Sequence, residues 1–297
     1  MKCKMIIALL KTMRPKQWTK NVIIFAALVF DEKLFDIPSL INTLFGFVIL
    51  CFISGTVYLI NDIVDIEKDK AHPKKRHRPL PSGAISKKTA TIIAIILPLI
   101  ILPFSFLLNI NFGLLMVGYL LLQLAYSFKL KHVVIIDVFT IAAGFVIRVG
   151  SGALLIDVSR FSPWLYVCTT LLALLLGFGK RRQELLLVEN SSQATRPILN
   201  DYSILFLDIL MTTVTSTTIM AYSLYTFSAP NLPDNHAMML TIPLVIYSVF
   251  RYLQLIYVQK SSGDPSEVLL KDHPLQVGLM LWGLSVIAIL YFKLGFS

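Results

Sequence analysis

The residues best suited to chemistry lie in one acidic stretch, Asn61-Asp-Ile-Val-Asp-Ile-Glu-Lys-Asp69, which follows a long apolar run. On an α-helix, which turns about 100° per residue, four of its oxygen-bearing side chains share a sector of roughly 100°, while Glu67 points away. These four are Asn61, Asp62, Asp65 and Asp69. Oxygen ligands in this arrangement suit two hard cations, or one cation with bridging water, bound to a diphosphate. The alternative is an acidic helix end that only contacts solvent.

A basic loop follows directly and runs from Lys70 to Gly83. Its prolines break the helix and stiffen the turn. We expect Arg76 and Arg78 beside the carboxylates, because a phosphate-bearing substrate needs direct cationic contacts as well as metal ligands. Attraction of the same basic residues to anionic lipid head groups is the alternative explanation.

A second group of candidates surrounds the next short loop. Tyr126 and Lys129 share one helix face, and Asp137 begins the following apolar segment. Arg148 lies about 16 Å further along that segment if it is helical. A buried arginine must face the bundle interior or a cavity, so Arg148 is either a functional group or the partner of Asp208 in a structural ion pair.

The third basic loop begins Gly179-Lys-Arg-Arg-Gln-Glu184. Glu184 shares a helix face with Lys180 and Arg181, and a solvated helix end is again the alternative. Residues 1–20 form an amphipathic, basic lead-in. There Trp18 is placed to anchor at the membrane interface, and Lys20 is placed to face the same cavity as the other candidates.

The composition indicates a membrane protein. Of the 297 residues, 56% are hydrophobic and 15% are charged, and the mean hydropathy is +0.74. Repeated apolar runs of about 20 residues predict an all-α polytopic membrane protein with nine spans in one domain, residues 1–297. The expected spans are residues 21–30, extended by the amphipathic lead-in, and then 39–60, 89–108, 112–128, 134–156, 164–179, 203–227, 238–258 and 276–292. The cysteines Cys3, Cys51 and Cys168 are expected to be packing residues without disulfides.

Charge placement predicts the orientation in the membrane. Most of the 27 lysine and arginine residues lie in the lead-in and in the loops after the second, fourth, sixth and eighth expected spans. By the positive-inside rule this side, with the N-terminus and the candidate loops, is cytoplasmic. Nine spans place the C-terminus outside. We expect the cytoplasmic membrane of a bacterium or archaeon. Because the topology already accounts for the net positive charge, that charge is no evidence for a nucleic-acid partner, and we expect none.

These motifs resemble those of the UbiA-type superfamily of membrane prenyltransferases. The signature N-D-x-x-D-x-x-x-D matches Asn61 to Asp69, an Arg-Pro-Leu-Pro-Ser-Gly turn matches Arg78 to Gly83, and a Tyr-Ser-x-x-Lys segment matches Tyr126 to Lys129. The resemblance covers essentially the whole chain and implies a UbiA-like helical bundle with a Mg²⁺-binding active site on the cytoplasmic side. One departure is that members typically carry a second aspartate-rich motif where this chain has basic residues 180–182.

The pairing of one acidic cluster with one basic cluster resembles the decaprenyl-phosphate phosphoribosyltransferase branch of the family. A basic second cluster suits a monophosphate held directly by Arg and Lys, and the opening from Arg14 to Asn21 resembles the same branch. The resemblance implies transfer of 5-phosphoribose from phosphoribosyl diphosphate to a polyprenyl monophosphate, with release of pyrophosphate. A homo-oligomer is compatible with the sequence.

The resemblance also implies roles for the candidate residues. Metal and diphosphate would be held by Asn61, Asp62, Asp65 and Asp69, and the catalytic set would be Asp62, Asp65, Asp69 and Lys129. The substrate-binding candidates are Lys20, Asn21, Arg76, Arg78, Tyr126, Lys129, Asp137, Arg148, Lys180, Arg181, Arg182 and Glu184.

Two alternative functions remain open. One is an intramembrane prenyltransferase that moves an isoprenyl group from its diphosphate to an aromatic acceptor. The other is a transporter of lipids or small molecules. Transporter sites usually lie near the membrane midplane on interrupted helices, whereas the charges here gather at helix ends.

Overall fold

The computed structural model describes residues 2–71, 75–156, 163–189, 197–229, 232–233, 235–258, 268 and 271–292. Of the basic residues used to predict the orientation, Lys74, Arg160, Arg196, Lys260 and Lys293 lie outside the described residues. The chain divides into two compact units. The first comprises Met1–Leu28, Lys33–Lys131 and Ile147–Val158, and the second comprises Val29–Glu32, His132–Val146 and Ser159–Ser297.

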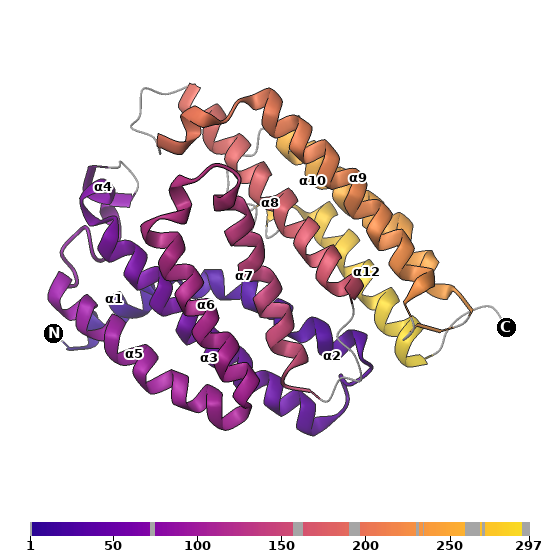
Figure 1. The fold of residues 1–297 in the computed structure, drawn as a ribbon, viewed down its shortest axis with the longest axis horizontal. Coiled ribbons are helices and arrows are strands. Elements are labelled where there is room, and N and C mark those ends of the chain that lie inside the picture. Colours follow the sequence, from indigo (N-terminus) through magenta and orange to yellow (C-terminus); the bar gives the residue numbers. More distant parts are fainter. Residues whose placement is uncertain are drawn as a thin grey trace. The chain divides into compact units, whose positions relative to one another are not determined.

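The first unit is built mainly from three long helices and the N-terminal segment (Figure 1). Its elements are α1 (Lys2–Thr12), the 3-10 helix η1 (Pro15–Phe25), α2 (Ala26–Phe30), α3 (Ile37–Val64), α4 (Ile66–Ala71), η2 (Lys75–His77), α5 (Lys87–Leu108), α6 (Ile110–Phe128) and η3 (Leu130–His132). The last residues of α2 and η3 belong to the second unit. Side-chain caps start the long helices, since Asp36, Ser86 and Asn109 each accept a hydrogen bond from the backbone N–H three residues later.

The second unit contains the later helices (Figure 1). Its elements are α7 (Ile136–Ala153), whose final residues belong to the first unit, α8 (Pro163–Glu189), η4 (Pro197–Asp201), α9 (Ile204–Ser228), η5 (Ala237–Thr241), α10 (Ile242–Tyr257) and α12 (His273–Phe292). Helix α8 packs along α9, and α10 packs along α12. Leu175, Phe178, Leu207 and Met211 lie in the buried core of this unit.

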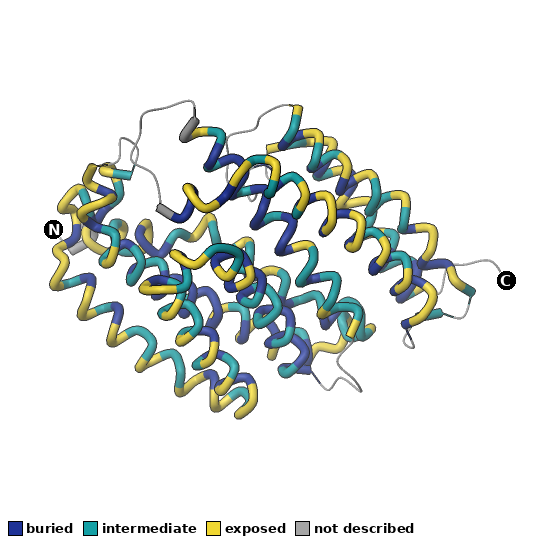
Figure 2. The backbone as a smooth tube through the Cα atoms, turned by 45° about the horizontal axis from the view of Figure 1, so that its top comes forward, coloured by how far each residue is buried: buried dark blue, intermediate teal, exposed yellow. Residues whose placement is uncertain are grey.

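Eight helices in the described part of the chain are long and apolar enough to cross a membrane. They coincide with the last eight expected spans. Large apolar side chains remain exposed along them, and Figure 2 shows exposed and buried residues alternating along the helices, as expected where lipid is the neighbour. The predicted all-α polytopic membrane fold is therefore confirmed. Cys51 is buried and Cys168 is partly buried, and both are free.

The first expected span, residues 21–30, differs from the prediction. It begins within the 3-10 helix η1 and ends in the short helix α2, so it is not among the eight spanning helices. Gly152 of α7 explains how closely this segment packs, since a Cβ atom there would lie 1.9 Å from the carbonyl oxygen of Ile24. Nine spans are not confirmed, and the cytoplasmic side and the outside position of the C-terminus stay predictions.

Helix α9 shows how polar residues are accommodated in such a span. The hydroxyls of Thr212, Thr213, Thr217 and Thr218 each donate to the backbone carbonyl four residues earlier. These hydroxyls are satisfied within their own helix, so they need no water in the membrane interior.

Candidate active site

The acidic stretch is helical but interrupted. Helix α3 ends at Val64, and Asp65 follows with φ −95° and ψ 11° before α4 begins at Ile66. Backbone hydrogen bonds still cross the interruption, from Asp65 N to the Asn61 oxygen at 2.9 Å and from Asp69 N to the Asp65 oxygen at 2.8 Å. The chain thus keeps a helical path, which holds Asp69 on the same side as Asp62.

Arg78 joins these two aspartates. Its Nη1 lies 3.3 Å from Asp62 Oδ1 and 2.5 Å from Asp69 Oδ2. Both carboxylates are buried, with side chains 3% and 5% exposed. Arg14 also donates to Asp62 Oδ1, and Lys75 Nζ lies 3.9 Å from Asp69 Oδ1. The expected combination of carboxylates with Arg78 is therefore present, and Arg14 is a member that the sequence-based site did not include.

Arg14 reaches the cluster from the connection between α1 and η1. Its backbone has φ 53° and ψ 65°, in the left-handed region that residues other than glycine seldom adopt. The guanidinium carbon also lies 4.9 Å from the centre of the Tyr58 ring, a cation–π distance. Its position before Pro15, in the basic opening segment, was the sequence signal for this role.

Asp65 has a different partner from its two neighbours. Lys131 Nζ lies 3.0 Å and 3.2 Å from the two Asp65 oxygens, and Lys131 is buried. Asn61 is only partly exposed, and Glu67 points into solvent and pairs with Lys70, as expected from its helix position. Lys131 was counted in the sequence only as a loop charge, because nothing local marks it as buried.

The donor atoms of this cluster match the expected metal in kind. Carboxylate oxygens are the ligands that Mg²⁺ prefers. In the residues that the structure describes, however, no group of three His, Cys, Asp or Glu side chains is arranged to hold a metal ion. Arg14, Arg78 and Lys131 instead neutralise the carboxylates. A metal ion bound to the same carboxylate oxygens would displace these basic side chains.

The other candidates in the first unit vary in their exposure. Arg76 and Lys129 are exposed, and Lys20 and Tyr126 are partly exposed. Arg76 Nε lies 3.4 Å from the neighbouring His77 ring nitrogen. Lys129 is the C-cap of α6 and forms no ion pair with any described residue. The structure therefore does not join the expected catalytic Lys129 to the aspartates.

Arg148 lies in a buried polar network of the first unit. Its Nε donates to Asn21 Oδ1 at 2.8 Å, and its Nη2 donates to the Tyr119 hydroxyl at 2.7 Å. Asn21 Nδ2 in turn donates to Ser54 Oγ at 3.1 Å and approaches Cys51 Sγ at 3.3 Å. The network ties η1 to α3, α6 and α7.

Arg148 and Asp208 belong to different units, so the ion pair offered as the alternative for Arg148 stays a prediction. Asp208 Oδ1 accepts from Arg182 Nε at 2.6 Å and from the Tyr257 hydroxyl at 3.0 Å. The Arg182 guanidinium also lies 4.2 Å from the centre of the Tyr257 ring. Within the first unit, Arg148 donates to the neutral oxygens of Asn21 and Tyr119.

The third basic loop is also paired within its own unit. Arg181 is 1% exposed, and its Nε lies 2.5 Å from Asp137 Oδ2. Its Nη1 lies 2.5 Å from Glu184 Oε2, which confirms that these two residues share a helix face. Lys180 is partly buried. The basic run therefore carries its own counter-charges, and Arg181 in particular is held away from solvent.

Tyr202 completes this buried group and was missed in the sequence. Its hydroxyl donates to Asp137 Oδ1 at 2.8 Å and accepts from the Ile135 backbone N–H at 2.7 Å. Burial raises the pKa of Tyr202, and the bond to Asp137 raises it further, so the phenol stays protonated. Asp137 is thus held from two sides.

Known proteins share this arrangement of sequence and fold. Residues 22–271 match the model of the UbiA prenyltransferase family. The chain belongs to this family. The decaprenyl-phosphate phosphoribosyltransferase of Mycolicibacterium smegmatis is 29% identical, over 97% of this chain and 94% of the relative. The enzyme of the same name from Corynebacterium glutamicum is 30% identical, over 95% of this chain and 86% of the relative.

Solved structures of family members have the same fold. A UbiA homolog from Archaeoglobus fulgidus, bound to GPP and Mg²⁺, has a TM-score of 0.72 at 19% identity and covers 96% of this chain and 99% of its own. A digeranylgeranylglyceryl phosphate synthase has a TM-score of 0.66 at 21% identity, with 98% of this chain and 99% of its own covered. At these identities the likeness establishes the fold.

Proposed function

We propose that the whole chain acts as one membrane-embedded, Mg²⁺-dependent transferase. It transfers 5-phosphoribose from phosphoribosyl diphosphate to a polyprenyl monophosphate of decaprenyl type. The bond from ribose C1 to the diphosphate breaks, C1 bonds to an oxygen of the lipid phosphate, and pyrophosphate leaves. The observation that carries the proposal is the near full-length similarity to two decaprenyl-phosphate phosphoribosyltransferases.

The charges of the first unit support this substrate. Asp62 and Asp69 are buried carboxylates that form ion pairs with Arg14 and Arg78. Candidate metal ligands and phosphate-binding cations are therefore already side by side. Bound Mg²⁺ would neutralise charge on the departing diphosphate. Arg14 and Arg78 would then move from the carboxylates to phosphate oxygens, where guanidinium groups bind in a bidentate manner. Asn61 and Asp65 remain candidate ligands of the same site.

The basic residues of the second unit divide into two kinds in this proposal. Lys180 and Arg182 are candidates for contacts to phosphate. Arg182 is also buried, but it pairs with a single carboxylate, that of Asp208, which is 31% exposed. Arg181 is held by two carboxylates, so we reassign it from substrate binding to positioning. Its partners Asp137 and Glu184 act with it.

No strong general base is needed for this reaction. The lipid phosphate is already an anionic nucleophile, and the ribosyl carbon passes through an oxocarbenium-like state, as in other glycosyl transfers. Positioning of the two substrates would supply most of the rate enhancement. The exposed Lys129 and partly exposed Tyr126, Lys20 and Arg76 remain candidate phosphate contacts rather than bases.

The deciding experiment is a transfer assay with purified protein in lipid nanodiscs. Phosphoribosyl diphosphate labelled in the ribose is incubated with decaprenyl phosphate and Mg²⁺, and the lipid fraction is extracted and counted. We expect a labelled phosphoribosyl lipid that requires Mg²⁺ and the lipid phosphate. A parallel reaction with labelled GPP and an aromatic acid tests prenyl transfer. Product in the second reaction alone would overturn the proposal.

A further inference from the structure

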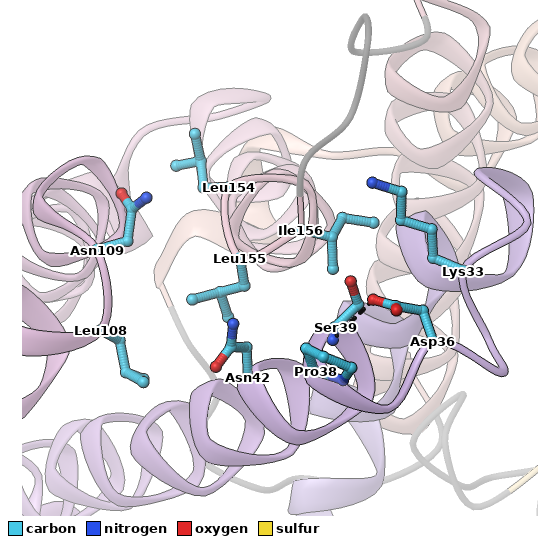
Figure 3. A pocket seen from close by; sticks show the side chains of 10 residues that line it. All are labelled: Lys33, Asp36, Pro38, Ser39, Asn42, Leu108, Asn109, Leu154, Leu155 and Ile156. Atoms are coloured by element: carbon cyan, nitrogen blue, oxygen red, sulfur yellow. Dashed lines mark hydrogen bonds between the residues drawn. The ribbon is translucent and has the colours of Figure 1, made fainter.

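A polar cavity opens in the first unit far from the aspartates. Its volume is about 650 Å³, and it lies where α3 and α6 begin and α7 ends (Figure 3). Ser39, which lines it, is 23 residues before Asp62 on α3, or about 35 Å along the helix axis. Because the apolar core of a bilayer is about 30 Å thick, the cavity and the acidic cluster lie at opposite membrane interfaces.

The cavity combines opposite charges with amide groups. In Figure 3, Lys33 and Asp36 line one side, Asn109 lines the opposite side, and Asn42 lies between them on α3. The Asn109 side-chain oxygen caps α6 through Phe112 N, so its amide N–H groups remain for another partner. The polar lining therefore contains one cation, one carboxylate and amide donors.

Asp36 is a carboxylate rather than a carboxylic acid. Hydrogen bonds from the Ser39 side chain and backbone lower the pKa of Asp36, and the nearby Lys33 lowers it further. The carboxylate is therefore ionised at neutral pH, and it faces the cavity together with the Lys33 ammonium (Figure 3). A ligand with separated positive and negative groups would match both charges.

The surroundings of the cavity are apolar and face outward. Phe35, Ile37, Leu107 and Ile110 are 69%, 67%, 81% and 70% exposed, which in a membrane protein indicates contact with lipid chains. Asn42 is exposed within the same apolar surface of α3, where an amide without a polar partner is costly. A lipid head group beside it would supply that partner.

We propose that this cavity binds the head group of a phospholipid that carries a primary amine, in the leaflet opposite the acidic cluster. The lipid phosphate is held by Lys33 with Asn42 and Asn109, and the lipid ammonium is held by Asp36. The acyl chains lie along the apolar surface that includes Ile37 and Ile110. The site takes no part in the transferase reaction. Its bound lipid would help to anchor the protein in the membrane.

The test uses native mass spectrometry of the full chain released from detergent. Phosphatidylethanolamine, phosphatidylcholine and phosphatidylglycerol with identical acyl chains are each titrated. We expect phosphatidylethanolamine to bind about tenfold more tightly than the other two, because phosphatidylcholine has no N–H to donate and phosphatidylglycerol has no cation. Equal binding of the three lipids would overturn the proposal, and this comparison needs no variant.

Variants then locate the site. Lys33→Ala should weaken phosphatidylethanolamine binding about tenfold. Asp36→Ser keeps a residue that caps α3 well but removes the carboxylate, so it should abolish the preference for phosphatidylethanolamine over phosphatidylglycerol. Lys88→Ala, an exposed lysine at the start of α5, is the matched control and should behave as wild type. An unchanged lipid preference in both Lys33→Ala and Asp36→Ser would show that the lipid binds elsewhere.

Discussion

Arg181 and Asp137 form an ion pair in which neither side chain meets solvent. Arg181 Nε lies 2.5 Å from Asp137 Oδ2, and the two side chains are 1% and 0% exposed. Buried pairs of this kind are costly to break, because the remaining charge is left without a partner. The pair therefore joins α7 to α8 within the second unit. A solvated helix end, which was the alternative interpretation of the sequence, would not join the two helices in this way.

Replacing one partner of this pair should destabilise the protein. Arg181→Met is expected to lower the free energy of unfolding by about 3–5 kcal/mol, since it leaves Asp137 buried and charged. The double variant Arg181→Met, Asp137→Leu should recover much of that loss. Thermal unfolding in detergent measures both. A positioning role further predicts that the stable double variant keeps its KM for phosphoribosyl diphosphate but loses kcat. Wild-type kcat in the double variant would contradict the positioning role.

The buried carboxylates of the first unit should be essential for turnover. Asp62→Asn and Asp69→Asn keep the side-chain volume but remove the charge, so we expect transfer to fall by at least about 100-fold, the scale of losing a group that stabilises developing charge. The nanodisc transfer assay measures this. Glu67→Gln is the control, because Glu67 is an exposed acid on α4, the helix that carries Asp69, and it pairs with Lys70. Comparable losses in all three variants would count against the site.

Arg14 should compete with metal and assist substrate. Arg14→Ala is expected to bind Mn²⁺, a spectroscopic substitute for Mg²⁺, about tenfold more tightly in the absence of substrate, because Asp62 loses a competing cation. The same variant should bind phosphoribosyl diphosphate more weakly. Electron paramagnetic resonance measures the first effect and equilibrium dialysis the second. Lys16→Ala, an exposed neighbour, is the control. Unchanged Mn²⁺ affinity in Arg14→Ala would disprove the competition.

The Arg148 network should matter for stability more than a surface arginine does. Arg148→Met leaves the Asn21 and Tyr119 oxygens without their donor, so we expect a loss of about 2–4 kcal/mol in unfolding free energy. Arg251→Met is a useful comparison, because Arg251 is partly exposed and pairs with Asp272 near the end of its span. That change should cost less than the change at Arg148. Similar melting temperatures for the two variants would contradict a structural role for Arg148.

Local sequence pattern predicted a large part of this protein. Eight spans were visible as apolar runs, and the acidic cluster was visible as carboxylates spaced three and four residues apart. Partner choice was not visible. Arg14 and Lys131 lie far along the chain from the aspartates they bind, and Tyr119 and Tyr202 look like ordinary aromatic core residues. Which polar group a buried side chain meets is decided by packing between helices, which spacing along one helix does not contain.

The first expected span shows the same limit. Residues 21–30 are apolar enough for a span, but whether such a stretch forms an α-helix or a 3-10 helix depends on what packs against it. Asn21 is fixed there by Ser54 and Arg148, and Ile24 packs closely against Gly152. None of these partners is near in sequence.

The contact between Gly152 and Ile24 also constrains the order of assembly during synthesis. The N-terminal segment emerges from the ribosome first, but the glycine that receives its backbone lies at the end of α7. Before α7 has entered the membrane, η1 can pack against α3 but lacks the close contact at Gly152. The contact of η1 with Gly152 therefore forms only after the middle of the chain has been synthesised, although η1 is synthesised first.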